Sequence, residues 1–277
     1  MSYHPNGAIK QFTYGNGIVH TLTQNARGLP AVSKDAYGST AYLQDEYAYD
    51  QHANVLAITD AATGRNQRGN RSMSYDALDR LKQTVSPMFG TAAYTYDVLD
   101  NLTRVQVGTT ATLAARDHHY CYDANWRLTN VKTGSCSGAT VIGLGYDVQG
   151  NVLNKSGQGY EFDLGNRLRR SVGKEWHAYD GHGRRVLSCT PTACDYQQYG
   201  SDGKLYYHRD NRSAKHFNNI YLGNSLVAIW ELPTAGGAVT VKYQHTDALG
   251  SPVAITDASR NVTERTEYEP YGRVGNP

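Results

Sequence analysis

The sequence lacks the segments that mark a membrane protein, a classically secreted precursor or a nucleic-acid-binding arm. No stretch approaches the ~18 consecutive apolar residues of a membrane-spanning helix, and Met1–Gly7 has no apolar run of a signal peptide. The charged residues give a net charge of only +2, and they form neither a basic run nor an acidic tail. We therefore expect no membrane span and no nucleic-acid partner.

Motifs of common catalytic and metal centres are also lacking. There is no HExxH, no GxSxG and no GxxxxGK[ST] in the sequence. We expect the histidines on the surface or on strand faces and not around a metal; the most conspicuous are His118, His119, His177, His182 and His245. Two pairs of carboxylates, Asp45 with Glu46 and Glu267 with Glu269, are expected at solvated strand ends. The sequence thus predicts a protein that is not an enzyme, with no catalytic, cofactor-binding or metal-binding residue.

What is present favours β-structure. Hydrophobic residues make up 39% of the chain and charged residues 19%, a balance too apolar for a disordered chain. There are 22 tyrosines against 3 tryptophans and 4 phenylalanines. Tyrosine favours strands and suits a sheet with one wet face. The 28 glycines and 8 prolines indicate frequent turns between short strands.

A seven-position phrase recurs along the chain: an aromatic residue, Asp, three variable residues, Asn or Arg, and an aliphatic residue. Its clear copies begin at Tyr49, Tyr75, Tyr96, Tyr122, Tyr146 and Phe162 and lie 16 to 26 residues apart. A copy at Tyr179 carries Arg185 in place of the aliphatic residue, and degenerate copies begin at Tyr199 and Tyr268. Self-similarity of this kind predicts a repeat architecture.

Each position of the phrase has a physical role in a β-hairpin. The aromatic residue ends one strand, and the Asp accepts hydrogen bonds from backbone amides that follow it, which starts a turn. The fifth position is often a residue that tolerates a turn conformation, and Gly and Asn accept a positive φ more readily than Asp; examples are Asp79, Asp100, Gly150, Asn166 and Gly183. The return strand then alternates, as where Val105 and Val107 alternate with polar neighbours.

One hairpin cannot bury its own apolar face, so neighbouring hairpins must pair into a long sheet. We predict an all-β fold of consecutive antiparallel hairpins in one strongly curved, continuous sheet. A single domain is expected over residues 1–277, with looser repeats in 1–48, clear repeats in 49–186 and degenerate repeats in 187–277.

The phrase resembles the repeat of the RHS/YD-repeat family over essentially the whole chain. The segment His245–Pro252, followed by Tyr268–Gly272, resembles the C-terminal part of RHS cores and is the most specific match. Members of this family wind such hairpins into a hollow shell around a toxic C-terminal domain, as in bacterial polymorphic toxins, the cocoon subunits of insecticidal toxin complexes and the YD shell of teneurins. The sequence reaches Gly275–Pro277 without the Asp-Pro box that closes the core in the family. The resemblance therefore implies an open shell segment, without a self-cleavage centre or a toxin domain.

The cysteines leave two alternatives open. Cys189 and Cys194 flank a proline turn, and Cys121 and Cys136 bracket a predicted hairpin. Two local disulfides would suit a secreted shell, and four free thiols would suit the cytosol.

Two functions follow from these observations. The first is a structural segment of an RHS shell, secreted or associated with the cell surface without a classical signal peptide, that encloses or presents a toxin or other cargo. Its expected partners are further repeats, the cargo domain and a secretion apparatus. The alternative is a module that binds carbohydrate or a cell surface through exposed tyrosines and through Trp126, Trp176 and Trp230.

Overall fold

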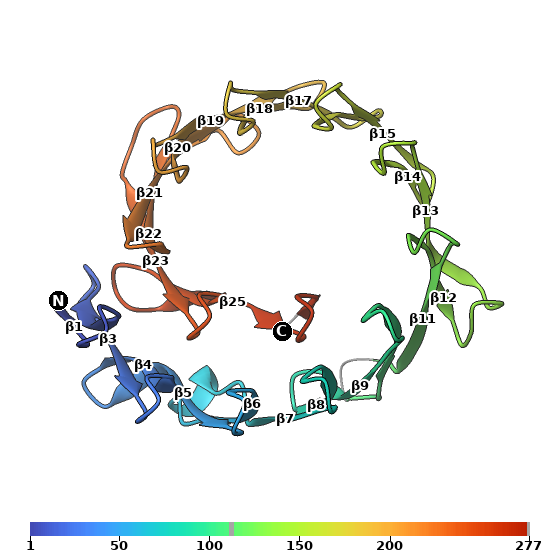
Figure 1. Cartoon of the computed structure of the whole chain (residues 1–277). Helices are drawn as coiled ribbons and strands as arrows, with labels where there is room; N and C mark the ends of the chain where they lie inside the picture. Colours follow the sequence, from blue (N-terminus) through green and yellow to red (C-terminus); the bar gives the residue numbers. More distant parts are fainter. Residues whose placement is uncertain (111–113, 276–277) are drawn as a thin grey trace. The chain divides into compact units, whose positions relative to one another are not determined.

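The computed structural model describes residues 1–110 and 114–275 and shows an all-β protein (Figure 1). Of the predicted domain over residues 1–277, positions 111–113 and 276–277 lie outside the described residues. The first strands are β1 Ser2–Tyr3, β2 Ile9–Thr13, β3 Val19–Gln24, β4 Pro30–Tyr37, β5 Thr40–Tyr49, β6 Val55–Asp60, β7 Arg71–Tyr75, β8 Leu81–Ser86 and β9 Gly90–Tyr96. The next are β10 Leu102–Val107, β11 Arg116–Tyr122, β12 Leu128–Thr133, β13 Thr140–Tyr146, β14 Val152–Lys155, β15 Gln158–Phe162, β16 Leu168–Ser171, β17 Glu175–Tyr179 and β18 Arg185–Cys189. The last are β19 Cys194–Tyr199, β20 Leu205–Asp210, β21 Lys215–Leu222, β22 Ser225–Pro233, β23 Thr240–Thr246, β24 Pro252–Thr256, β25 Val262–Arg265, β26 Glu267–Tyr268 and β27 Val274–Gly275.

Strand pairing follows the order of the chain. Among the described residues, 25 strands belong to one sheet and β26 pairs with β27 in a second. Neighbours pair antiparallel, as in β7 with β8, β8 with β9 and β9 with β10. The only described helix is one 3₁₀ turn, Gly64–Asn66, and no described helix is long and apolar enough to cross a membrane. The predicted fold of consecutive antiparallel hairpins in one continuous sheet is confirmed.

The described chain divides into two compact units. Unit 1 comprises residues 1–117, 223–227 and 242–277, and unit 2 comprises residues 118–222 and 228–241.

Within unit 1, the strands show the predicted alternation of buried and exposed side chains. Val105 and Val107 of β10 are 5% and 4% exposed, whereas Gln106 between them is exposed. They lie opposite Tyr94 and Ala92 of β9, which are also buried. Pairing thus places apolar side chains of both strands of this hairpin together, and β9 pairs in turn with β8 of the preceding hairpin, which adds the burial that one hairpin cannot achieve alone.

The C-terminal strands of unit 1 pack against its N-terminal strands (Figure 1). The hydroxyl of Tyr14 donates to the carbonyl oxygen of Gln244 at 3.1 Å, and Asn16 Nδ2 donates to Thr256 Oγ1 at 3.0 Å. The guanidinium of Arg260 lies 4.0 Å from the ring centroid of Tyr37. These contacts join residues more than 200 positions apart in the sequence.

Unit 2 contains the strands from β12 to β21 as a continuous series of hairpins. Three polar residues, His177, Ser188 and Asp195, lie opposite one another on β17, β18 and β19. They are 2%, 5% and 4% exposed, and His177 Nδ1 lies 3.1 Å from Ser188 Oγ. At these three positions of unit 2, neighbouring strands therefore bury polar side chains against one another.

Candidate functional site

The recurrent polar residues of the phrase form a series of linked turns, which we call the turn ladder. The turn from Asp76 to Arg80 shows its first component. Asp76 Oδ1 accepts hydrogen bonds from the backbone amides of Leu78 and Arg80 at 2.9 and 3.1 Å, and Asp76 Oδ2 accepts from Arg80 Nε at 2.8 Å. The side-chain hydrogen bond from Arg80, with the backbone bonds, holds the pKa of Asp76 below its ordinary value.

The same carboxylate contact recurs in the other turns. In each of them the carboxylate accepts the backbone amide four residues further on; the residues are Asp50, Asp97, Asp123, Asp147, Asp163, Asp180, Asp247 and Asp257. The predicted role of the aspartate in starting the turn is confirmed.

The fifth position of the phrase adopts the left-handed backbone conformation that tight turns require. The predicted turn formers Asp79, Asp100 and Asn166 have φ values of 59°, 64° and 58°. Ala53 and Trp126 occupy the same position with φ values of 73° and 61°. Neither residue type favours this conformation, so these two turns carry backbone strain that their neighbours hold in place.

The tyrosine at the first position links its hairpin to the preceding one. The hydroxyl of Tyr75 donates to the carbonyl oxygen of Val55 at 2.9 Å, and Val55 is the seventh residue of the preceding copy. Equivalent bonds run from Tyr96 to Leu81, Tyr146 to Leu128 and Tyr179 to Leu168, at 2.6 to 2.8 Å. Tyr221, outside the phrase, donates to Leu205 at 3.1 Å. The tyrosine hydroxyl therefore connects one repeat to the next.

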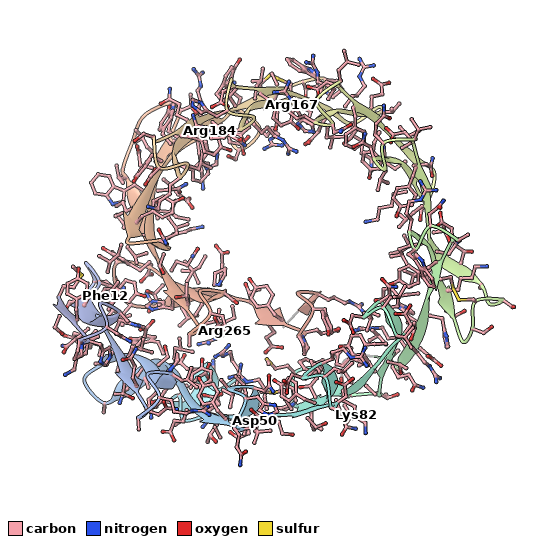
Figure 2. All side chains as sticks on the ribbon, viewed as in Figure 1. Phe12, Asp50, Lys82, Arg167, Arg184 and Arg265 are labelled. Atoms are coloured by element: carbon pink, nitrogen blue, oxygen red, sulfur yellow. A yellow bond between two sulfur atoms is a disulfide. The ribbon has the colours of Figure 1, made fainter. Side chains whose placement is uncertain are left out.

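The Asn or Arg at the sixth position links its turn to the following one. Arg80 Nη1 donates to the carbonyl oxygen of Asp97 at 3.0 Å and to Asp100 Oδ1 at 2.7 Å. Arginines at this position also lie over the tyrosine ring of the next copy at 4.8 to 5.4 Å: Arg80 over Tyr96, Arg127 over Tyr146, Arg167 over Tyr179 and Arg184 over Tyr199. Figure 2 labels two of these arginines, Arg167 and Arg184. Such stacking adds a cation–π attraction to the hydrogen bonds.

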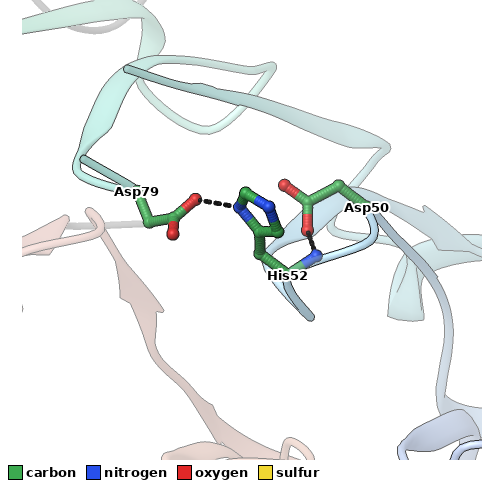
Figure 3. Close-up of side chains that lie close together, drawn as sticks. All are labelled: Asp50, His52 and Asp79. Carbon is green, nitrogen blue, oxygen red and sulfur yellow. Dashed lines mark hydrogen bonds and ion pairs between the residues drawn. The ribbon is translucent and has the colours of Figure 1, made fainter. Parts of the chain in front are cut away.

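Figure 3 shows the link between the first two clear copies, where one histidine and two aspartates lie together. His52 Nδ1 and Asp79 Oδ1 are 2.8 Å apart, and Asn54 Nδ2 donates to the same oxygen at 2.8 Å. The hydrogen bond with Asp79 raises the pKa of His52. The backbone amide of His52 donates to Asp50 Oδ1 at 2.8 Å. These contacts follow the pattern of the turn ladder and account for the proximity of the three side chains.

A buried cluster in unit 1 contains one of the conspicuous histidines. His245 is fully buried, and its Nδ1 lies 2.7 Å from Asp35 Oδ2 while its Nε2 lies 2.9 Å from Thr256 Oγ1. His20 Nδ1 lies 2.6 Å from Asp35 Oδ1. Burial raises the pKa of Asp35, but hydrogen bonds from His20 and His245 outweigh it and hold that pKa below its ordinary value. His245 therefore lies on a strand face of β23, one of the two expected positions, and N-terminal residues such as Asp35 and Tyr14 bury that face.

The expectation of solvated carboxylates was wrong for Asp45 and Glu269. Asp45 lies within β5, is 0% exposed and pairs with Arg68 and Arg71 at 2.5 and 2.6 Å. Glu269 is 8% exposed and pairs with Arg116. Arginines distant in the sequence compensate both buried charges, a pairing that the sequence pattern does not reveal.

The structure resolves the alternatives for the cysteines in favour of two disulfides. Cys121 is bonded to Cys136 and Cys189 to Cys194, and no described cysteine is free. Both bridges join residues within 15 positions of each other, as the spacing suggested.

The three tryptophans are all partly exposed side chains of unit 2. Trp126, Trp176 and Trp230 are 58%, 43% and 46% exposed. Trp176 lines a cavity of about 200 Å³ with Arg170, Lys174 and other residues of the neighbouring hairpins. The structure therefore places an aromatic surface beside two cationic residues.

The fold and the turn ladder define a protein built from repeated, mutually bonded β-hairpins. Residues 68–112 match the model of the RHS repeat family, and the resemblance to the RHS/YD-repeat family is thereby confirmed. None of the curated proteins matches the sequence.

Solved structures share the fold over nearly the whole chain. A chain in the structure of the Photorhabdus luminescens Tc holotoxin pore aligns with 99% of this chain at a TM-score of 0.76 and 18% identity. A chain in the crystal structure of TcdB2-TccC3 aligns with 99% at a TM-score of 0.75 and 18% identity. This chain spans 15% and 16% of the length of those two chains.

Proposed function

We propose that this chain is a structural segment of an RHS-type shell that encloses or presents a toxin or other secreted cargo, without catalytic activity of its own. The turn ladder is the observation that carries this proposal. Polar groups that recur along the repeats are engaged within the sheet: the aspartates close turns, several tyrosine hydroxyls donate to the preceding copy, and Arg80 donates to the following one. Residues arranged in this way stabilise the sheet itself, because their hydrogen-bonding groups are used within it.

Two further observations support a shell outside the cytosol. Both disulfides are of the local kind that persists in oxidising compartments. The solved structures that share the fold include the Tc holotoxin pore, a toxin assembly. Family members to which the phrase is similar enclose a toxic domain, and we extend that role to the protein of which this chain forms a part.

A protease-protection experiment tests the cargo role. A destabilised reporter polypeptide is joined to the C-terminus of the chain through a flexible linker, and its digestion by a broad-specificity protease is followed by mass spectrometry. Shelter of the reporter by the repeats predicts slower digestion in the fusion than in an equimolar mixture of the separate chain and reporter. A fusion of the same reporter to an unrelated β-domain is the matched control. Equal digestion rates in all three samples would contradict the cargo role.

A second candidate is carbohydrate binding at Trp176. The cavity beside this indole is also lined by Arg170, Lys174 and Glu175, so a stacking surface and charged groups face the same space. An acidic sugar fits this chemistry, with its ring on the indole and its carboxylate on the cations. A glycan array probed with the native chain, Trp176→Ala and the control Trp230→Ala tests it. Binding lost only in Trp176→Ala supports this site, and no binding by the native chain contradicts it.

A further inference from the structure

In one link of the turn ladder, an arginine lies between two carboxylates. Arg80 Nη2 lies 2.7 Å from Asp76 Oδ2 in its own turn, and Arg80 Nη1 lies 2.7 Å from Asp100 Oδ1 in the following turn. The cation at the sixth position of the phrase thus balances two negative charges. One belongs to the second position of its own copy and the other to the fifth position of the next copy.

The preceding link of the ladder has the same two carboxylates but a neutral residue between them. Asn54 holds the sixth position, and its Nδ2 donates to Asp50 Oδ2 at 3.0 Å and to Asp79 Oδ1 at 2.8 Å. Among the described residues, no arginine or lysine forms an ion pair with Asp50 or Asp79. This link therefore lacks the cation that the following link places between its carboxylates.

His52 adds a nitrogen ligand to this pair of carboxylates (Figure 3). It occupies the fourth position of its turn. The other clear copies carry Leu78, Leu99, Asn125, Gln149 and Gly165 there, so the turn does not require a histidine. One ligand atom each of Asp50, His52 and Asp79 lies within 4.8 Å of the other two. The side chains of His52 and Asp79 are 67% and 48% exposed, so an ion in solution can reach them.

We propose that Asp50, His52 and Asp79 bind a divalent transition-metal ion of the zinc class. Zn²⁺ takes imidazole nitrogen and carboxylate oxygen as ligands, and an exposed site with three protein ligands leaves a position for water. The imidazole separates this set from the all-oxygen sets that Ca²⁺ and Mg²⁺ prefer. Ligand atoms about 2.1 Å from a tetrahedral zinc ion lie about 3.4 Å apart, so rotation of exposed side chains closes the present separation. The double positive charge balances both carboxylates.

A bound ion joins two copies of the phrase. Asp50 and His52 belong to one turn, and Asp79, 27 positions beyond His52, belongs to the next. The ion therefore holds the two turns together, as Arg80 does in the following link. No local metal motif marks the site in the sequence, because its ligands come from separate copies.

Isothermal titration calorimetry with Zn²⁺, on the full chain without an affinity tag, tests the proposal. The native chain is expected to bind zinc at this site and to show no binding of Mg²⁺ or Ca²⁺. His52→Ala and Asp79→Asn are each expected to raise the zinc dissociation constant roughly tenfold or more, since loss of even a hydrogen-bond partner of a ligand costs about tenfold. Asn tolerates the positive φ of position 79, so the second variant keeps the turn.

Two further variants make the test specific. His182 is the matched control, because it is exposed and holds the same fourth position in its own turn. There Arg184 Nη2 lies 3.4 Å from His182 Nδ1, and the following copy has Gly203 at its fifth position. His182→Ala is therefore expected to bind zinc like the native chain. Asn54→Arg places a guanidinium between the two carboxylates and is expected to abolish binding, with the fold kept in circular dichroism.

Each outcome supports or overturns the proposal. A native chain that binds no zinc, or zinc binding that is unchanged in His52→Ala or Asn54→Arg, would overturn it. Binding weakened equally in His182→Ala would also overturn it. Calcium or magnesium binding that survives in His52→Ala would assign the site to a hard cation held by the carboxylates alone. The result is independent of the proposed shell, because the protease-protection experiment tests the cargo role without added metal.

Discussion

Removing tyrosine hydroxyls from the turn ladder of unit 2 tests how much each repeat stabilises the next. Tyr146, Tyr179 and Tyr221 donate to backbone carbonyl oxygens of the preceding hairpins at 2.6, 2.7 and 3.1 Å. A hydrogen bond of this kind contributes about 1 kcal/mol to stability, and a carbonyl left without its partner keeps the desolvation cost. The carbonyl oxygen of Leu205 still accepts a hydrogen bond from Asn219 Nδ2 at 2.8 Å, so we expect the smallest loss at Tyr221. The three tyrosines lie four strands apart in sequence order, so their effects are expected to add to about 2–3 kcal/mol in the triple Tyr→Phe variant.

Tryptophan fluorescence is the appropriate signal, because all three tryptophans belong to unit 2. Urea unfolding of the native chain and of the triple variant would give the difference in the free energy of unfolding. Tyr196→Phe is the matched control, since this half-exposed side chain lies outside the ladder, and we expect it to leave the midpoint unchanged. A triple variant that loses less than about 1 kcal/mol, or a control that loses as much, would refute the reasoning.

Three further predictions follow from single sites. Asp35→Asn is expected to destabilise unit 1 by about 3 kcal/mol at neutral pH, because a buried charge partner is removed. Since the pKa of Asp35 is lowered in the folded chain, the contribution of Asp35 to stability is present above pH ~4 and is lost as the pH falls through the folded pKa. Circular dichroism at pH 3 and pH 7 would check this dependence. Replacing Cys121 and Cys136 by serine is expected to cost about 3 kcal/mol in urea unfolding, given the loop that the bridge closes, and no loss would contradict a formed disulfide. Trp126→Gly is expected to raise stability by about 0.5–1 kcal/mol because glycine accepts the φ of 61° without strain, whereas Trp126→Ala keeps the strain and should show no such gain in thermal unfolding.

The local part of the fold could be predicted from the sequence, because the phrase specifies its own turn. The phrase itself contains the groups that the turn needs: an Asp, a residue of positive φ, and then Asn or Arg. The turn conformation of Asp79, Asp100 and Asn166 was therefore predicted correctly. The sequence left the disulfide between Cys189 and Cys194 as one of two alternatives, although both residues flank one predicted turn.

Contacts between distant residues could not be predicted in this way. The tyrosine hydroxyls donate hydrogen bonds to the preceding hairpin, but the phrase does not indicate which backbone carbonyl group lies opposite each hydroxyl. His245 and Asp35 are 210 positions apart, and nothing in either local sequence indicates that the C-terminal strands cover β4. The burial of Asp45 can likewise be explained only once its ion pairs with Arg68 and Arg71 are known.

Hydrogen–deuterium exchange of the native chain and of the triple Tyr→Phe variant tests most directly the claim that the phrase couples each hairpin to the one before it. The account predicts faster exchange in β12, β16 and β20, whose carbonyl groups lose their tyrosine partners, although none of these strands is altered in sequence. Faster exchange confined to the substituted strands β13, β17 and β21, or no change at all, would contradict it.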